Sequence, residues 1–233
     1  GSITCCDLNG PMGLASAKQI VANTRGDDLA INLFFPGKIQ LGLASGNLVD
    51  LTVESDFPFE RKVRMQLCAQ TPARFTVSVR IPNWSERSCL KVDGVEYDAI
   101  PGTYTKITRE WGTSSEITLD FDLRVKSLLS AKDNRIAIER GPVVFARDEN
   151  MDLQFDASVQ LAPHCGYIAA RIERPFYESV WQQIEIATQD GGSFRMVDWA
   201  SICNWNGRRT CTWLPLKPGE TVSQQTRGAL QHG

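Results

Sequence analysis

Two adjacent cysteines near the start of the chain, Cys5 and Cys6, are the residues of this sequence best suited to metal or covalent chemistry. Neighbouring thiols can bind one zinc ion, and a thiol that loses its proton becomes a strong nucleophile. Zinc prefers about four ligands, so the pair alone would be half of a site. The simpler alternative is two ordinary core thiols, because free cysteine is among the most buried residue types.

A short helix is expected directly behind the pair. The run Asn9-Gly10-Pro11 is typical of a helix start, because an Asn side chain caps free amides and proline is tolerated in the first turn. Apolar residues then recur at helical spacing at Leu14, Ala17, Ile20 and Val21. We therefore expect a helix at residues 10–22, whose apolar face needs a packing partner.

From Leu29 onward the sequence alternates between apolar and polar residues in short runs, which is typical of β-strands. Among the clearest signals is a hairpin with a turn at Asp93-Gly94. The pattern indicates an all-β chain of two antiparallel β-sandwiches, jelly-roll-like, behind one helix. We place the units at residues 1–23, 24–126 and 127–218, and expect residues 219–233 to form a disordered tail.

The composition of the chain argues against two classes of binding partner, nucleic acids and membranes. The chain has 233 residues, 42% of them hydrophobic, and a net charge of −2, which argues against a nucleic-acid partner. No apolar run approaches the roughly 18 residues of a membrane span, so no membrane partner is expected. The 7 cysteines lack the spacing of a disulfide framework. Because the chain opens with Gly1-Ser2, we expect native sequence upstream, and bacterial cytoplasm, periplasm and secretion all stay open.

Two other polar candidates are weaker. Glu54 and Asp56 at a strand end could be mistaken for a pair of catalytic carboxylates, although solvated carboxylates are commoner at such positions. His164-Cys165 could be half of a metal site, but the other histidine, His232, lies in the expected tail. We expect both features to be structural or simply exposed.

Aromatic residues in the second half of the chain are a further candidate. Trp181, Trp199, Trp205 and Trp213 could stack on sugar rings. Tryptophans at strand spacing more often pack in a core or between domains, and we favour that interpretation. The run Arg140-Gly141-Pro142 is expected to be a turn whose arginine pairs with a carboxylate.

Short motifs in a characteristic order give the sequence a family resemblance. They are CCDLNGP at 5–11, VESDFP at 53–58, RIPNWS at 80–85, VDG at 92–94, ERGPVV at 139–144 and TWLP at 212–215. On these motifs, which cover about residues 3 to 216, the chain resembles the C-terminal portion of the β-L-arabinofuranosidase-like glycoside hydrolases of family 127.

The resemblance implies an N-terminal (α/α)6 barrel that carries the active site, followed by two β-sandwiches. The cysteine pair would then lie at the end of the barrel, just before its last helix. Cys5 would be the nucleophile of a retaining mechanism with a glycosyl-thioether intermediate. Cys5 and Cys6 would bind zinc together with a glutamate and a third cysteine from upstream, and a separate upstream glutamate would be the acid/base.

The resemblance also implies what this chain would do by itself. The parent would hydrolyse arabinofuranoside-type or related glycans, whereas this chain is expected to be inactive and to hold no stoichiometric zinc. The helix, without its barrel neighbours, is expected either to mediate self-association or to leave the first dozen or so residues disordered. The alternative function is a non-catalytic carbohydrate-binding or structural β-sandwich module. A cysteine–histidine hydrolase is disfavoured because the sequence lacks a suitable histidine.

Overall fold

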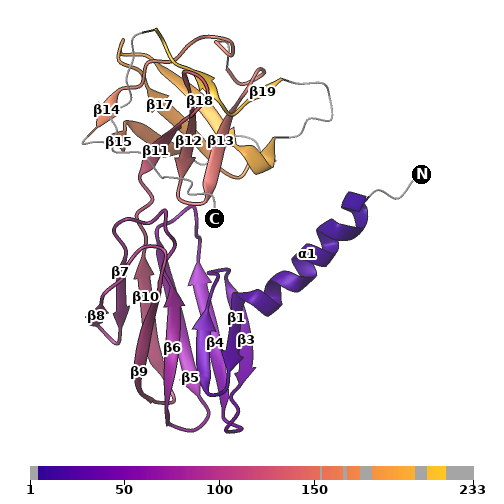
Figure 1. Ribbon diagram of the computed structural model, residues 1–233, viewed down its shortest axis with the longest axis vertical. Helices are drawn as coiled ribbons and strands as arrows, with labels where there is room; N and C mark the ends of the chain where they lie inside the picture. Colours follow the sequence, from indigo (N-terminus) through magenta and orange to yellow (C-terminus); the bar gives the residue numbers. More distant parts are fainter. Residues whose placement is uncertain (1–4, 153, 165–166, 174–179, 203–208, 219–233) are drawn as a thin grey trace. The chain divides into compact units, whose positions relative to one another are not determined.

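The structure is a computed structural model that describes residues 5–152, 154–164, 167–173, 180–202 and 209–218. The expected tail at 219–233 therefore lies outside the described residues. The chain divides into two compact units, residues 1–122 and 123–233, which we describe separately. Both consist mainly of antiparallel β-strands (Figure 1), so the all-β prediction is confirmed. The expected boundary after residue 126 falls inside a strand of the second unit, β11 (Val125–Leu129).

The helix α1 (Cys5–Val21) begins earlier than the sequence indicated. The expected start at residue 10 was wrong, because Pro11 lies inside α1 rather than opening it. Proline removes one backbone hydrogen bond, but it does not prevent residues before it from being helical. The other end of α1 is fixed by Asn32, whose backbone amide donates to Val21 O over 2.8 Å and whose Nδ2 donates to Ile20 O over 2.9 Å. These bonds satisfy carbonyls that a helix end leaves free.

The first unit contains two sheets. One has the order β1-β2-β6-β9 and the other β3-β4-β5-β10-β7-β8. The strands of the first sheet are β1 (Ala22–Arg25), β2 (Asp28–Ile31), β6 (Ala73–Arg80) and β9 (Tyr104–Trp111). Those of the second are β3 (Gly37–Gly42), β4 (Leu48–Ser55), β5 (Lys62–Ala69), β10 (Ser115–Asp120), β7 (Cys89–Val92) and β8 (Val95–Tyr97).

The pairing within these sheets is antiparallel with one exception. β2 runs parallel to β6, with Leu29 opposite Val77, so the expectation of a purely antiparallel sandwich was wrong at this pair. The reason lies in the order of the chain, since β3, β4 and β5 belong to the other sheet and separate β2 from β6. A parallel pair requires such a crossover connection.

Alternation in the sequence produces the core of the first unit. In β4, for example, Val49, Leu51 and Val53 are buried while their neighbours face outward. Trp111 is fully buried, and its indole Nε1 donates to Phe75 O over 3.0 Å. The hairpin between β7 and β8 is confirmed: Asp93 and Gly94 have φ of 48° and 82°, as a type I′ turn requires.

The second unit contains one large antiparallel sheet, a small two-stranded sheet and a hydrophobic core. The path is β11, β12 (Arg135–Arg140), β13 (Val143–Asp148), β18 (Ser193–Asp198), β17 (Gln183–Ala187) and β16 (Ala170–Glu173). β19 (Thr210–Cys211) pairs with β13 and β20 (Leu214–Pro215) with β12, while β14 (Pro163–His164) and β15 (Tyr167–Ile168) form a small separate sheet. A short 3-10 helix, η1 (Trp199–Ser201), follows β18. Ile138, Phe145, Ile184, Met196 and Leu214 are fully or almost fully buried in its core.

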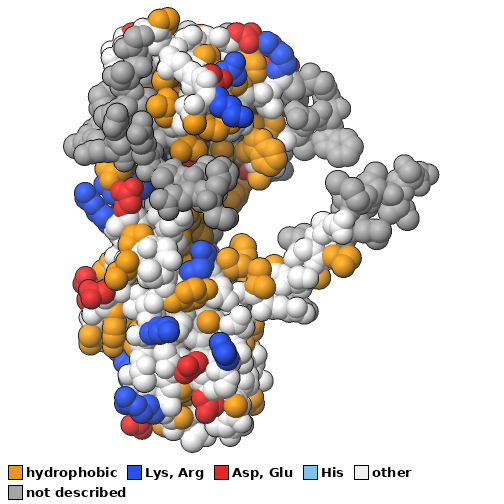
Figure 2. All heavy atoms as spheres, in the orientation of Figure 1, with side chains coloured by type: hydrophobic (Ala, Val, Ile, Leu, Met, Phe, Trp, Pro, Cys, Tyr) orange, Lys and Arg blue, Asp and Glu red, His pale blue; other side chains and the backbone are white. Residues whose placement is uncertain are grey.

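On the face of each unit visible in Figure 2, basic and acidic side chains are interspersed among the described residues. This mixture agrees with the small net charge of −2. None of the helices in the described ranges is both long and apolar enough to cross a membrane.

Candidate functional site

The cysteine pair lies in the first turn of α1. Backbone amides at a helix start have no partner within the helix, and the helix dipole is positive there, so this position favours anionic groups. The side chains of Cys5 and Cys6 lie outside the described residues, so their roles as nucleophile and zinc ligands stay predictions. Thiol is a donor type that zinc prefers, and two thiols supply half of its usual ligands. Among the side chains that the structure describes, no group of three or more His, Cys, Asp or Glu could hold a metal ion.

The other polar candidates do not form a site. Glu54 and Asp56 are exposed at the end of β4, and the carbonyl of Asp56 accepts from the amides of Phe59 and Glu60 in a turn. These positions agree with solvated strand-end carboxylates. His164 belongs to β14, and its neighbour Cys165 lies outside the described residues. Arg140 ends β12 and is buried, and burial lowers the pKa of its guanidinium.

The tryptophans depart from expectation. Trp181 is 51% exposed, Trp199 61% and Trp213 38%, so packing in the core, one of the two expected alternatives, was wrong for these three, and packing between domains stays a prediction. Trp205 lies outside the described residues. Strand spacing alone did not distinguish a buried indole from an exposed one, because Trp181 and Trp199 lie just beyond the ends of β17 and β18.

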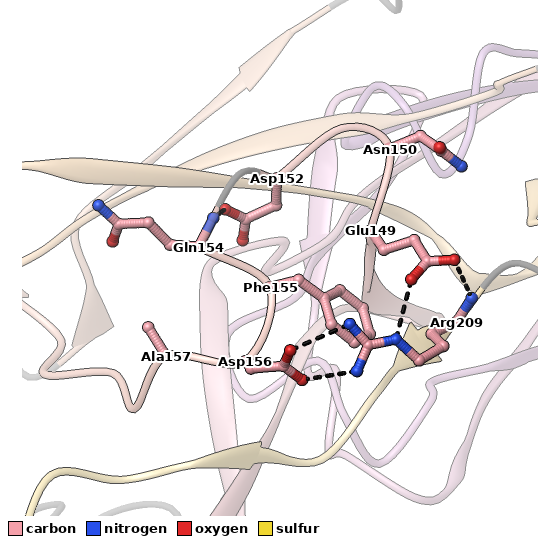
Figure 3. Close-up of a pocket in the computed structure, with 8 residues that line it drawn as sticks. All are labelled: Glu149, Asn150, Asp152, Gln154, Phe155, Asp156, Ala157 and Arg209. Carbon is pink, nitrogen blue, oxygen red and sulfur yellow. Dashed lines mark hydrogen bonds and ion pairs between the residues drawn. The ribbon is translucent and has the colours of Figure 1, made fainter.

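Sequence reasoning missed a depression in the second unit, which has a volume of about 550 Å³ (Figure 3). It lies in the long irregular stretch that follows β13, where acidic residues are frequent. The acidic residues were the one signal in the sequence, but they did not indicate which arginines would pair with them. The lining residues are Glu149, Asn150, Asp152, Gln154, Phe155, Asp156, Ala157 and Arg209.

Arg209 joins the two sides of this depression. Its backbone amide and Nε donate to the Glu149 carboxylate over 2.8 and 2.9 Å. Nη1 and Nη2 donate to the two oxygens of Asp156, each over 3.0 Å (Figure 3). The guanidinium also lies 4.7 Å from the centre of the Phe155 ring. Hydrogen bonds that Arg209 donates to the carboxylates of Asp156 and then Glu149 raise the Arg209 pKa, so the arginine stays charged.

A second arginine, Arg147, is buried and contacts the irregular segment after β13 that lines the depression. Arg147 Nε is 2.7 Å from Asp152 Oδ2, in ion-pair rather than hydrogen-bond geometry, and the two side chains are 2% and 6% exposed. Nη1 donates to the carbonyl of Ala157 over 2.8 Å and to those of Gln154 and Phe155 over 3.3 Å. Each carboxylate that lines the depression therefore has an arginine partner. This arrangement suits holding the loop in place better than acid/base catalysis.

The Glu149–Arg209 contact predicts a pH dependence. Hydrogen bonds from the backbone amide and then the side chain of Arg209 lower the Glu149 pKa from its ordinary 4.5. A carboxyl with a depressed pKa binds fewer protons when folded, so its contribution is present above the unfolded pKa and is lost as pH falls through the folded pKa. We expect the unfolding free energy of the second unit to fall in acid below about pH 4.5.

The check is the difference between the wild-type chain and Glu149→Gln in urea unfolding from pH 7 to pH 3. The variant should lose less stability over this range, because it cannot be protonated. Glu185 and Asp190 also have depressed pKa values and continue to titrate in both proteins. Parallel curves for the two proteins would show that the contact does not contribute.

Comparisons with known proteins connect the fold to a family. Residues 28–123 match the family model described as the beta-L-arabinofuranosidase GH127 middle domain. No curated protein sequence matches the chain.

Solved structures match over both units. A GH127 β-L-arabinofuranosidase from Geobacillus stearothermophilus T6 superposes with a TM-score of 0.76 at 22% identity, covering 91% of this chain and 37% of that one. A GH127 β-arabinofuranosidase gives 0.77 at 18% identity, covering 91% and 38%. A structure described as a glycoside hydrolase gives 0.76 at 20% identity, covering 92% and 40%. This chain thus spans 37% to 40% of the length of these structures. The resemblance to glycoside hydrolase family 127 is confirmed: residues 28–123 match the model of its middle domain, and the chain shares its fold with these structures.

Proposed function

We propose that this chain is the C-terminal portion of a retaining, zinc-dependent cysteine glycosidase that acts on arabinofuranoside-type or related glycans. The observation that carries the proposal is the match of residues 28–123 to the GH127 middle domain, directly behind a helix whose first turn bears Cys5 and Cys6. Similar folds over 91% of the chain in two GH127 enzymes support the same assignment.

In this proposal Cys5 is the nucleophile. Its thiolate attacks the anomeric carbon, a C–S bond forms as the glycosidic C–O bond breaks, and an acid from another part of the longer protein protonates the departing oxygen. Water, deprotonated by the same group, then displaces the sulfur and regenerates the thiolate. Two inversions give net retention, as in carboxylate-based retaining enzymes.

Cys5 and Cys6 would also be zinc ligands, and bound zinc would keep the thiols deprotonated. The remaining ligands are assigned to the longer protein, because two thiols leave about half of the usual coordination open. This chain alone is therefore proposed to be inactive and to hold zinc weakly.

The experiment compares the longer protein with the 233-residue chain on a nitrophenyl arabinofuranoside. Turnover by the longer protein with retained configuration in the first-formed sugar, and none by this chain, is the expected result. Comparable turnover by the 233-residue chain, or an inverted product, would contradict the proposal. If neither protein acts on the substrate but both bind glycan, the alternative of a carbohydrate-binding module takes its place.

A further inference from the structure

Two exposed tryptophans are held at one end of the β17–β18 pair. The last backbone hydrogen bond of this pair runs from Asp198 N to Gln182 O over 2.9 Å. Trp181 and Trp199 are the next residues on either side of it, and each residue is more than half exposed. Large aromatic side chains usually lie inside, so two together on the surface of one unit require an explanation.

A buried carboxylate fixes the backbone beneath both tryptophans. Asp198 is 1% exposed, and its Oδ2 accepts from the amides of Gln182 and Trp181 over 2.8 and 3.2 Å. The same carboxylate accepts from Ser201 N over 2.9 Å and from Ser201 Oγ over 2.7 Å, which fixes η1. One side chain thus connects the segment that carries Trp181 to the segment that carries Trp199. A surface fixed in this way loses little conformational entropy when it binds a ligand.

The described segments that carry the two tryptophans present no free charge. Within residues 180–182 and 197–202, Asp198 is the one ionisable side chain, and its carboxylate is buried and fully engaged by the bonds just described. These described segments therefore offer no counter-charge to a charged peptide or a nucleic acid. A neutral ligand with a flat apolar face suits this surface, and the C–H face of a sugar ring has that character.

We propose that Trp181 and Trp199 form a carbohydrate-binding surface, on which the indole rings stack against the C–H faces of neutral sugar residues of a polysaccharide. The choice of carbohydrate rests in part on the proposed function. The surface itself requires neither thiol nor zinc, so it can be tested on the 233-residue chain whether or not the parent hydrolyses arabinofuranosides.

The test is native affinity electrophoresis of this chain in gels that contain soluble arabinan or soluble arabinoxylan, with the Kd then measured by titration calorimetry. Retardation by at least one polysaccharide is the expected result. Trp181→Ala and Trp199→Ala should each weaken binding about tenfold, since one aromatic stacking contact contributes about that factor. Trp181→Phe and Trp199→Phe should retain most of the affinity, because a smaller ring can still stack.

Trp213→Ala is the matched control. Trp213 is also exposed but precedes β20, and its removal should leave the Kd unchanged. Thermal unfolding of every variant shows whether the fold is preserved. Absence of retardation by both polysaccharides overturns the proposal, as does equal weakening by Trp213→Ala. Concentration-dependent dimerisation that Trp181→Ala abolishes, without polysaccharide binding, would assign the surface to a second copy of the chain instead.

Discussion

Replacing Cys5 by alanine or serine in the longer protein is expected to reduce kcat at least about a thousandfold, because the thiol proposed as the nucleophile is removed. The Cys6→Ser variant should lose bound zinc as well as activity, since a hydroxyl is a poor replacement for a thiolate ligand. The measurements are initial rates on an aryl arabinofuranoside and metal content per chain.

Cys68→Ser is the matched control for this experiment. Cys68 is a free, partly buried thiol in β5, opposite Asp50 of β4, and nothing places it near the chemistry. Its substitution should leave kcat within about twofold of wild type, as expected for a change that removes no transition-state contact. An active Cys5→Ala enzyme would remove the thiol from the proposed mechanism.

The largest expected effect on stability comes from Arg147. Arg147→Met keeps most of the apolar stem of the side chain but leaves Asp152 as an unpaired buried carboxylate, and it frees three carbonyls of the 154–157 loop. Breaking a buried ion pair from one side costs about 3–5 kcal/mol, a large part of the stability of a small domain. We expect the second unit to unfold at markedly lower urea concentration, as followed by tryptophan fluorescence.

Arg209→Met tests whether burial sets this cost. Arg209 pairs with two carboxylates, whereas Arg147 pairs with one, but the Arg209 side chain is 58% exposed. Exposed ion pairs contribute little to stability because water screens them, so this variant should be only slightly destabilised. The double variant Arg147→Met with Asp152→Leu should recover part of the loss, because no charge is then left buried. Equal destabilisation by Arg147→Met and Arg209→Met would show that burial does not set the cost.

The β-strands could be predicted where one face is buried. The alternation in β4, β5 and β6 follows directly from a pleated strand with one side in the core, and the Asp93-Gly94 turn requires positive φ at both residues. The parallel pairing of β2 with β6 could not be predicted, because alternation specifies which face of a strand is buried but not its partner.

The candidate functional residues could be predicted only in part. Cys5 and Cys6 were recognised from a motif, whereas the Arg209 contacts join residues 149, 156 and 209 across a loop with no periodic pattern. The exposure of Trp181 and Trp199 was also missed, since the sequence does not show where β17 and β18 stop. Pairings between distant irregular segments are set by tertiary packing, which local propensity does not contain.

The parallel β2–β6 pair has a consequence for synthesis of the chain. β2 cannot complete its sheet until β6 has left the ribosome, because the strands between them belong to the other sheet. Pairings between strands this distant in sequence form slowly. The chain loses conformational entropy on closing the long loop before the contacts between the strands can offset that loss. Asn32, which fixes the end of α1, directly follows β2. The helix that carries the two thiols and the residue that fixes its end therefore emerge well before β6, the strand with which β2 pairs.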